Sequence, residues 1–213
     1  MLSGFSFFAG QKSLPLTYDP FFKYIFHPDR HADRLENFIS SILGMQVKIR
    51  SILPVEDSLI DGETYLIMDL LVELEDGSLA NIEIQKNGYA FTEERLSCYA
   101  ADLLMRQYTR VRGLKGQEFT YRDIKKVYVI VLYEKTPAEF HRQPDVYFHH
   151  GAVTFDSQIH LNLLDEYFLI SLDVFRKIPY SEDRKGNLSG DRPAAPQTRG
   201  GHQYVVGSVT DFG

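Results

Sequence analysis

Two stretches near the start of the chain carry apolar residues at helical spacing. The first follows Asp19-Pro20, where Asp can cap free amide groups and Pro lacks only an N–H that the first helical turn leaves unused. Its apolar positions are Phe21, Phe22, Ile25 and Phe26. The second stretch covers residues 32–43, has one apolar face, and is followed by Gly44, a residue suited to ending a helix. The pattern therefore predicts two amphipathic helices.

Further along, the apolar period changes and predicts strands. Residues 47–52 alternate between apolar and polar side chains, as in a half-buried strand. Residues 66–74 and 79–86 flank a Glu-Asp-Gly-Ser sequence, which predicts a hairpin. The apolar run at 126–133 indicates a buried central strand. Two more strands are expected, at 147–155 and 159–164.

A third helix is predicted between the hairpin and the central strand. Thr92 is placed to cap it, and Phe91 and Leu96 are spaced as a hydrophobic staple across its first turn. The helix should run to about Tyr108. The order helix, helix, strands, helix, strand predicts an α/β domain with a mixed β-sheet flanked by helices.

The chain divides into three parts by composition. We expect an N-terminal extension at 1–16, a folded domain at 17–180 and an irregular tail at 181–213. From Ser181 onward the apolar periodicity vanishes, and Gly and Pro interrupt a polar sequence. The tail is therefore expected to be largely unpacked.

The composition restricts the classes of function. The chain has 213 residues, 44% of them hydrophobic, and a formal net charge of -6. Phosphate binding depends on clustered Lys and Arg, so any contact with DNA must be local. Cys98 is the single cysteine and has no partner for an internal disulfide, which favours a cytoplasmic setting. No apolar run reaches the roughly 18 residues of a membrane-spanning helix, so no membrane partner is expected.

The predicted hairpin holds the most informative polar residues. Asp69 and Glu83 stand among aliphatic neighbours, where a charge is costly unless it is paired or bound to a metal. Mg²⁺ prefers oxygen ligands, usually one or two carboxylates with water and phosphate oxygens. Carboxylates near a hairpin are more often solvated, so spacing alone does not decide the matter. The neighbouring residues Glu73, Glu75 and Asp76 are expected to be surface charges around the turn.

The length of the turn decides whether the two carboxylates can meet. Glu83 and Gln85 share one face of their strand because side chains alternate. A two-residue turn at Asp76-Gly77 would point Asp69 away from Glu83. A three-residue turn over 76–78, or a bulge, would bring Asp69 opposite Gln85 with Glu83 diagonal to it. We predict one of these two arrangements.

Three motifs together resemble a known superfamily. A strand Asp, a Gly turn and then Ile82-Glu-Ile-Gln85 is similar to the PD-(D/E)XK nucleases, specifically their recombination-promoting nuclease and transposase branch, where Gln commonly replaces Lys. Residues 19–26 look like that branch's Asp-x-x-Phe-Lys-x-x-Phe signature. Residues 95–99 look like its Arg-x-x-x-Tyr. The resemblance covers about 17–177 and implies a restriction-endonuclease-like core.

The resemblance also implies a metal site. Asp69, Glu83 and the backbone carbonyl of Ile84 would bind Mg²⁺, or Mn²⁺ in its place. Gln85 would orient a water or a phosphate oxygen, so the implied catalytic set is Asp69, Glu83 and Gln85. Gln does not titrate at neutral pH, and activation of water would therefore fall to the metal.

Substrate contacts are expected on the helix that follows the hairpin. Arg95 and Tyr99 are four residues apart and share a face, where Arg95 would clamp a phosphate and Tyr99 would hold Gln85 or a substrate oxygen. Lys23 could also reach substrate, although a solvated helix face explains it equally well. The remaining basic residues expected to follow the DNA backbone are Arg106, Arg110, Arg112 and Lys115.

These features favour a metal-dependent DNA endonuclease linked to recombination or transposition. A weakly active or inactive module that binds nucleic acid or protein on the same fold is one alternative, and an RNA-directed nuclease is another. A homodimer would be convenient for cutting both strands. Because members of this branch usually continue with packed helical sequence, the tail from Ser181 is expected to mark a truncated or frame-altered product.

Overall fold

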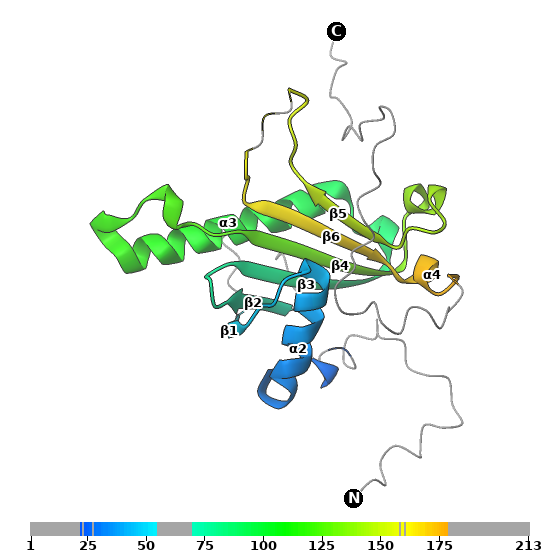
Figure 1. Ribbon diagram of the computed structural model, residues 1–213, viewed down its shortest axis with the longest axis horizontal. Helices are drawn as coiled ribbons and strands as arrows, with labels where there is room; N and C mark the ends of the chain where they lie inside the picture. Colours follow the sequence, from blue (N-terminus) through cyan, green and yellow to red (C-terminus); the bar gives the residue numbers. More distant parts are fainter. Residues whose placement is uncertain are drawn as a thin grey trace, which may run out of the picture. The chain divides into compact units, whose positions relative to one another are not determined.

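The computed structural model of the chain describes residues 22, 24–26, 28–54, 70–157, 159 and 161–178, with the backbone alone at 28–31 and 90 (Figure 1). In the first predicted helix, the amide of Phe26 donates to the carbonyl of Phe22 at 2.9 Å, which closes one helical turn. The predicted start of that helix at Asp19-Pro20 and the predicted tail from Ser181 lie outside the described residues.

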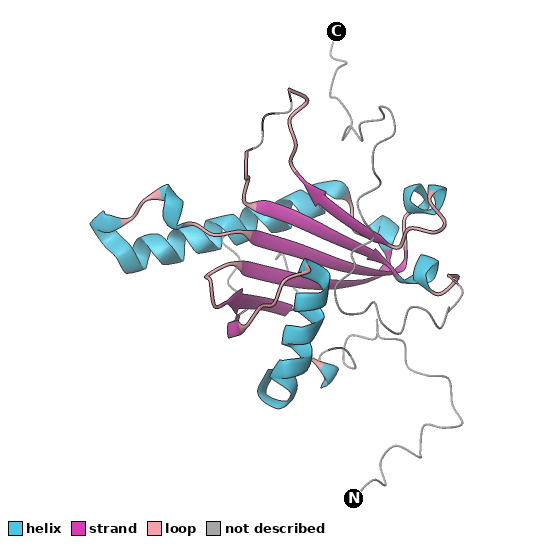
Figure 2. Cartoon of the chain, viewed as in Figure 1, coloured by secondary structure: helices cyan, strands magenta, loops and turns pink. Residues whose placement is uncertain are grey.

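Six strands form one mixed sheet (Figure 2). They are β1 Ile49–Leu53, β2 Leu70–Leu74, β3 Leu79–Asn87, β4 Val127–Lys135, β5 Phe148–Ala152 and β6 Asp165–Ser171. Their order across the sheet is β1-β2-β3-β4-β6-β5. β4 runs parallel to both of its neighbours, β3 and β6, and every other pair is antiparallel. The predicted mixed sheet is therefore confirmed.

Helices connect and cover these strands. The α-helices are α2 Pro28–Leu43, α3 Glu93–Lys115 and α4 Leu172–Phe175. Short 3-10 turns are η2 Gly88–Ala90, η3 Gly116–Glu118, η4 Tyr121–Asp123 and η5 Ala138–Arg142. Parallel strands need a long crossover connection, and α3 provides it between β3 and β4.

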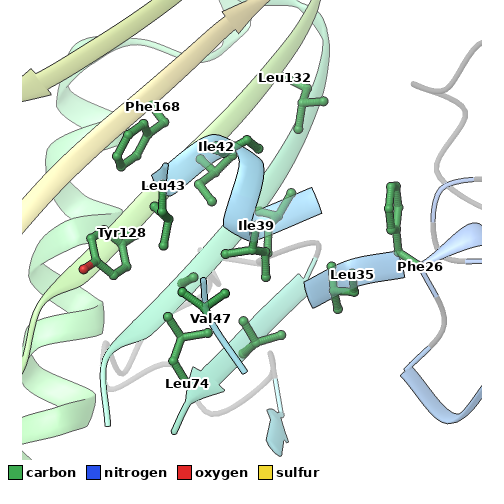
Figure 3. Packing of buried hydrophobic residues seen from close by; sticks show 14 of the residues in the cluster. Phe26, Leu35, Ile39, Ile42, Leu43, Val47, Leu74, Tyr128, Leu132 and Phe168 are labelled. Atoms are coloured by element: carbon green, nitrogen blue, oxygen red, sulfur yellow. The ribbon is translucent and has the colours of Figure 1, made fainter. Parts of the chain in front are cut away.

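The face of the sheet covered by α2 holds an apolar cluster. Leu35, Ile39 and Ile42 of α2 are buried because their helical spacing places them on one stripe. Figure 3 shows Ile42 near Phe168 of β6 and Leu35 nearer Phe26, and all four residues belong to one cluster. Gly44 follows the helix with a φ of 64°, so the predicted stop is confirmed.

The face covered by α3 holds a second cluster. Tyr99 and Leu103 of α3 pack with Leu71, Val129 and Val131 from the strands. Successive side chains of β3 point to opposite faces of the sheet. Ala80 and Ile82 belong to the cluster under α2, whereas Leu79 belongs to the cluster under α3. Odd-numbered positions of β3 therefore face α3.

The β2–β3 turn has the odd length that the sequence predicted, but it covers residues 75–77. The amide of Leu74 donates to the Ser78 carbonyl at 2.8 Å, and the amide of Gly77 donates to the Leu74 carbonyl at 2.9 Å. Gly77 has a φ of 88°, the left-handed conformation that this turn requires. Leu70 consequently pairs with Ile82, two positions away from the predicted register.

Two predicted elements differ from the structure. α3 continues to Lys115, past its predicted end at Tyr108. The strand predicted at 159–164 is wrong, because the described residues there form no strand and the ladder begins at Asp165. Its alternating side chains Ile159, Leu161 and Leu163 are exposed, so the alternation does not correspond to a buried face.

Candidate metal centre

Glu83 is a buried carboxylate on the α3 face of the sheet. Its side chain is on β3, and the residue is 1% exposed. The Asn81 Nδ2 donates to Glu83 Oε1 at 3.1 Å, and the Gln85 Nε2 donates to Oε2 at 3.4 Å. These three residues occupy every second position of one strand, so their side chains lie in a row on the same face. A carboxylate buried in this way is costly unless it is paired or bound to a metal.

Asn81 is a residue that the sequence interpretation missed. It is fully buried, and its Oδ1 has no hydrogen-bond partner among the described residues. An unpartnered buried oxygen beside a buried carboxylate fits a hard cation, which takes oxygen ligands. The signal was present in the sequence, because Asn81 has the same strand parity as Glu83 and Gln85.

Ile84 and Lys86 lie on the other face of β3. The Ile84 side chain packs against the α2 cluster, so only its backbone is available to a ligand on the α3 face. Lys86 is exposed. No lysine therefore stands in the position that Gln85 occupies.

Arg95 and Tyr99 form a fixed pair on the first turns of α3. The Arg95 Nη2 donates to the Tyr99 hydroxyl at 2.9 Å, and the guanidinium lies 4.8 Å from the centroid of the Phe91 ring. Tyr99 is fully buried and packs on Phe91, with 5.4 Å between ring centroids. The cation is thus held against two aromatic rings, on the face of the sheet that carries Glu83.

Further along the same helical face, arginines are engaged within the chain. The Arg106 Nε donates to Asp102 Oδ2 at 2.7 Å, and its Nη1 donates to the Pro54 carbonyl at 3.4 Å. Arg110 forms an ion pair with Glu73 of β2. Of the predicted DNA contacts, Arg106 and Arg110 therefore have protein partners already.

The expectation that Glu73 is a surface charge is wrong. The residue is 3% exposed, and Arg50 and Ser51 donate to its carboxylate at 3.0 and 3.1 Å, in addition to Arg110. Burial raises the pKa of Glu73, but the hydrogen bonds and charges of these partners outweigh it and hold the pKa below its ordinary value. Glu73 is an ionised structural carboxylate.

Some predicted site residues fall where the structure gives no description. Asp69, Asp19 and Lys23 lie outside the described residues. In the part of the chain that is described, no group of three or more His, Cys, Asp and Glu side chains could hold a metal. Glu83 is thus the member of the predicted carboxylate pair whose surroundings are known.

Comparison with protein families identifies the family of this chain. The family model of the PD-(D/E)XK nuclease family transposases matches residues 16–185 of the 213. The chain belongs to this family. The predicted resemblance and the restriction-endonuclease-like fold class are therefore confirmed. Searches of curated proteins and of solved structures returned no match. Among the described helices, none is both long and apolar enough to cross a membrane.

Proposed function

We propose that this chain is a Mg²⁺-dependent endodeoxyribonuclease that hydrolyses phosphodiester bonds during recombination or transposition. Family membership supplies the general class, a nuclease-type transposase. The metal, the DNA substrate and the hydrolytic reaction are our proposal, and Asp69, Glu83 and Gln85 are its catalytic residues.

The register of the β2–β3 hairpin carries this proposal. Leu71 pairs with Asn81 and Leu70 pairs with Ile82. If the ladder continues by one residue, Asp69 falls directly opposite Glu83, and opposed residues share a face. That face is the one that α3 covers. Opposed side chains have Cβ atoms about 5 Å apart, so the two carboxylates would be close neighbours.

Two carboxylates at that separation would repel each other unless a cation lay between them. Asp69, Glu83 and the carbonyl of Ile84 would hold Mg²⁺, and the unpartnered Oδ1 of Asn81 adds an oxygen beside them. When bound, Mg²⁺ would supply Lewis-acid stabilisation of charge on the phosphate oxygens.

The chain's own polar groups would position the substrate. The Gln85 amide, turned toward Glu83, offers a neutral oxygen and N–H groups that can orient a water or a phosphate oxygen without titrating. Arg95 would donate to a phosphate oxygen and stabilise the negative charge that grows in the transition state. Because Tyr99 and Phe91 already fix the guanidinium, little reorganisation is needed when substrate binds.

Cleavage of supercoiled plasmid tests the proposal. The full chain with Mg²⁺ should nick or linearise the DNA, and EDTA should abolish cleavage. Asp69→Asn and Glu83→Gln should each lower the rate by about 10²–10³-fold, because a metal contact is worth several kcal/mol in the transition state. Glu75→Gln, an exposed carboxylate in the same hairpin turn, is the matched control and should cut normally. Unchanged cleavage by both site variants would remove Asp69 and Glu83 from the mechanism.

A module that binds nucleic acid without cutting it is the second candidate. The presence of Gln85 where other branches carry Lys favours it, since Lys86 lies on the opposite face and cannot substitute. The same assay discriminates between the two, because such a module would retain DNA binding and release no product with Mg²⁺ or Mn²⁺. Replacing the plasmid by RNA of equal length tests the RNA-directed alternative.

A further inference from the structure

The end of α3 and the two short helices that follow it project from the sheet. Figure 1 shows these segments reaching past the ends of the strands on the side where β4 begins. We call residues 108–126 the arm. Gly116 reverses the chain at its tip with a φ of 56°. The arm is a separate feature from the candidate metal centre, since Arg95 stands at the opposite end of α3.

Aromatic packing fixes the base of the arm. Tyr108, Phe119 and Tyr121 contact one another, with ring centroids 5.4 to 6.0 Å apart. A capping box between Thr120 and Asp123 closes η4. Side chains on the arm are therefore presented by a packed structure instead of an open loop.

The arm is basic in an acidic chain. Residues 108–126 contain six Lys or Arg and two acidic residues, a surplus of four positive charges, whereas the whole chain has a formal net charge of -6. A concentration of positive charge on one projection attracts a polyanion.

Three of these cations form ion pairs with described residues, and three do not. Arg110, Lys115 and Lys126 form ion pairs with Glu73, Asp123 and Glu166. The other three, Arg112, Arg122 and Lys125, are exposed and form no ion pair with a described residue. The Arg112 guanidinium lies 5.5 Å from the centroid of the Tyr108 ring, which holds it on the arm's surface.

We infer that the arm binds the sugar-phosphate backbone of DNA outside the cut site, through Arg112, Arg122 and Lys125. The inference rests on the proposed function for its choice of polyanion. Arg95 and Arg112 are 17 positions apart on one helix, which is about 25 Å by helical rise and corresponds to about seven base pairs of B-DNA. One rigid helix thus connects the reacting phosphate with the flanking backbone.

A second copy of the chain is a poorer occupant. Two arms carry the same surplus of positive charge and would repel each other. The large apolar side chains that the arm exposes are Leu114 and Tyr121, too few for a dimer interface of ordinary size. Charge complementarity therefore favours DNA.

Binding of a fluorescein-labelled 30-base-pair duplex to the full chain, measured by anisotropy in EDTA across a salt series, tests the inference. The arm variant is Arg112→Glu, Arg122→Glu, Lys125→Glu. The control variant is Arg34→Glu, Arg142→Glu, Arg176→Glu, which makes the same change in net charge at exposed residues on other elements. The arm variant should weaken binding by about tenfold or more at 0.1 M salt and reduce the salt slope by about 2 to 3, since each phosphate contact contributes about 0.9. The control variant should change binding less than about twofold.

The outcomes separate this inference from the proposed function. If the wild-type chain binds DNA without cutting it and the arm variant binds weakly, the nuclease proposal is overturned and DNA binding by the arm is supported. If cleavage is normal and the arm and control variants bind DNA equally well, the inference that the arm binds DNA is overturned. A wild-type chain that does not bind the duplex overturns it as well. Loss of a dimer in sedimentation equilibrium by the arm variant, with DNA binding intact, assigns the surface to a second copy instead.

Discussion

At the scale of single residues, the buried carboxylate of Glu73 depends on its two arginines. Glu73→Gln would keep the shape of the side chain and remove its charge, leaving Arg50 and Arg110 without their anion. Both arginines retain contact with solvent, so the loss should be modest, about 1–2 kcal/mol of unfolding free energy at pH 7. Urea denaturation measures it, with Glu139→Gln on the exposed turn η5 as control.

The effect of Glu73→Gln should depend on pH in a defined direction. The pKa of Glu73 is lowered in the folded chain from a reference of 4.5, by its partners and against the effect of burial. Its ionised form therefore stabilises the fold above pH 4.5, and this contribution is lost as the pH falls through the folded pKa. The gap between wild type and variant should narrow below pH 4.5. A gap that stays constant down to pH 3 would show that the carboxylate's charge is not what stabilises the fold.

The strand face of a residue could be predicted from sequence where alternation along the strand and the family motif agree. Glu83 and Gln85 were placed on one strand face from alternation, and the structure has both there. The burial of Glu73 could not be predicted locally, because it depends on Arg50 of β1 and Arg110 of α3, which are distant in the sequence. No motif marks Asn81, although it occupies the same face of β3 as Glu83 and Gln85. Asp69 and Lys23 stay predictions.

At the scale of elements, two glycines should respond oppositely to the same substitution. Gly77 in the β2–β3 turn has a φ of 88°, and Gly77→Ala should destabilise the chain by about 1 kcal/mol because L-residues disfavour that conformation. Gly113 lies inside α3, and a Cβ there would have nothing within 4 Å. Gly113→Ala should therefore stabilise by about 0.5–1 kcal/mol, from helix propensity alone.

Thermal melts of these two variants, with Gly77→Asn as a third, measure the effect. Asn tolerates the left-handed conformation and should lose less stability than Ala. The Cβ added at Gly77 would lie 3.4 Å from Lys125 Cγ, an ordinary contact, so the expected loss comes from backbone conformation. Equal changes in melting temperature for Gly77→Ala and Gly113→Ala would contradict this explanation.

The sequence predicts poorly an element whose charged residues find their ion-pair partners on elements distant in the chain. The predicted strand at 159–164 ends before Asp165 and Glu166, whereas β6 begins with these two residues. In the structure Glu166 pairs with Lys126 and His150, which come from β4's flank and from β5. α3 extends past its predicted end at Tyr108, and the basic residues Arg112 and Lys115 in its last turn suit the negative end of a helix.

At the scale of the whole folded unit, the two faces of the sheet differ in the polarity of their buried side chains. The α2 face is a continuous apolar cluster and supplies stability. The α3 face is apolar at its centre but carries a row of buried or half-buried polar groups, including Glu73, Asn81 and Glu83. α3 contributes both the cover of this face and Arg95, so the helix that completes the core also brings a cation to the candidate metal centre.

Metal binding should therefore be coupled to the stability of the whole unit. A metal present at 100 times its dissociation constant adds about 2.7 kcal/mol, which raises the melting temperature by about 5–10 °C for a domain of this size. If Asp69 and Glu83 are opposed, their repulsion destabilises the metal-free fold. Glu83→Gln should then raise the metal-free melting temperature and also remove the shift caused by Mg²⁺, whereas Glu75→Gln should change neither. Calorimetry in EDTA and in Mg²⁺ measures both quantities. A Glu83→Gln variant that is less stable without metal and still shifts with Mg²⁺ would mean that Glu83 is a structural carboxylate, like Glu73.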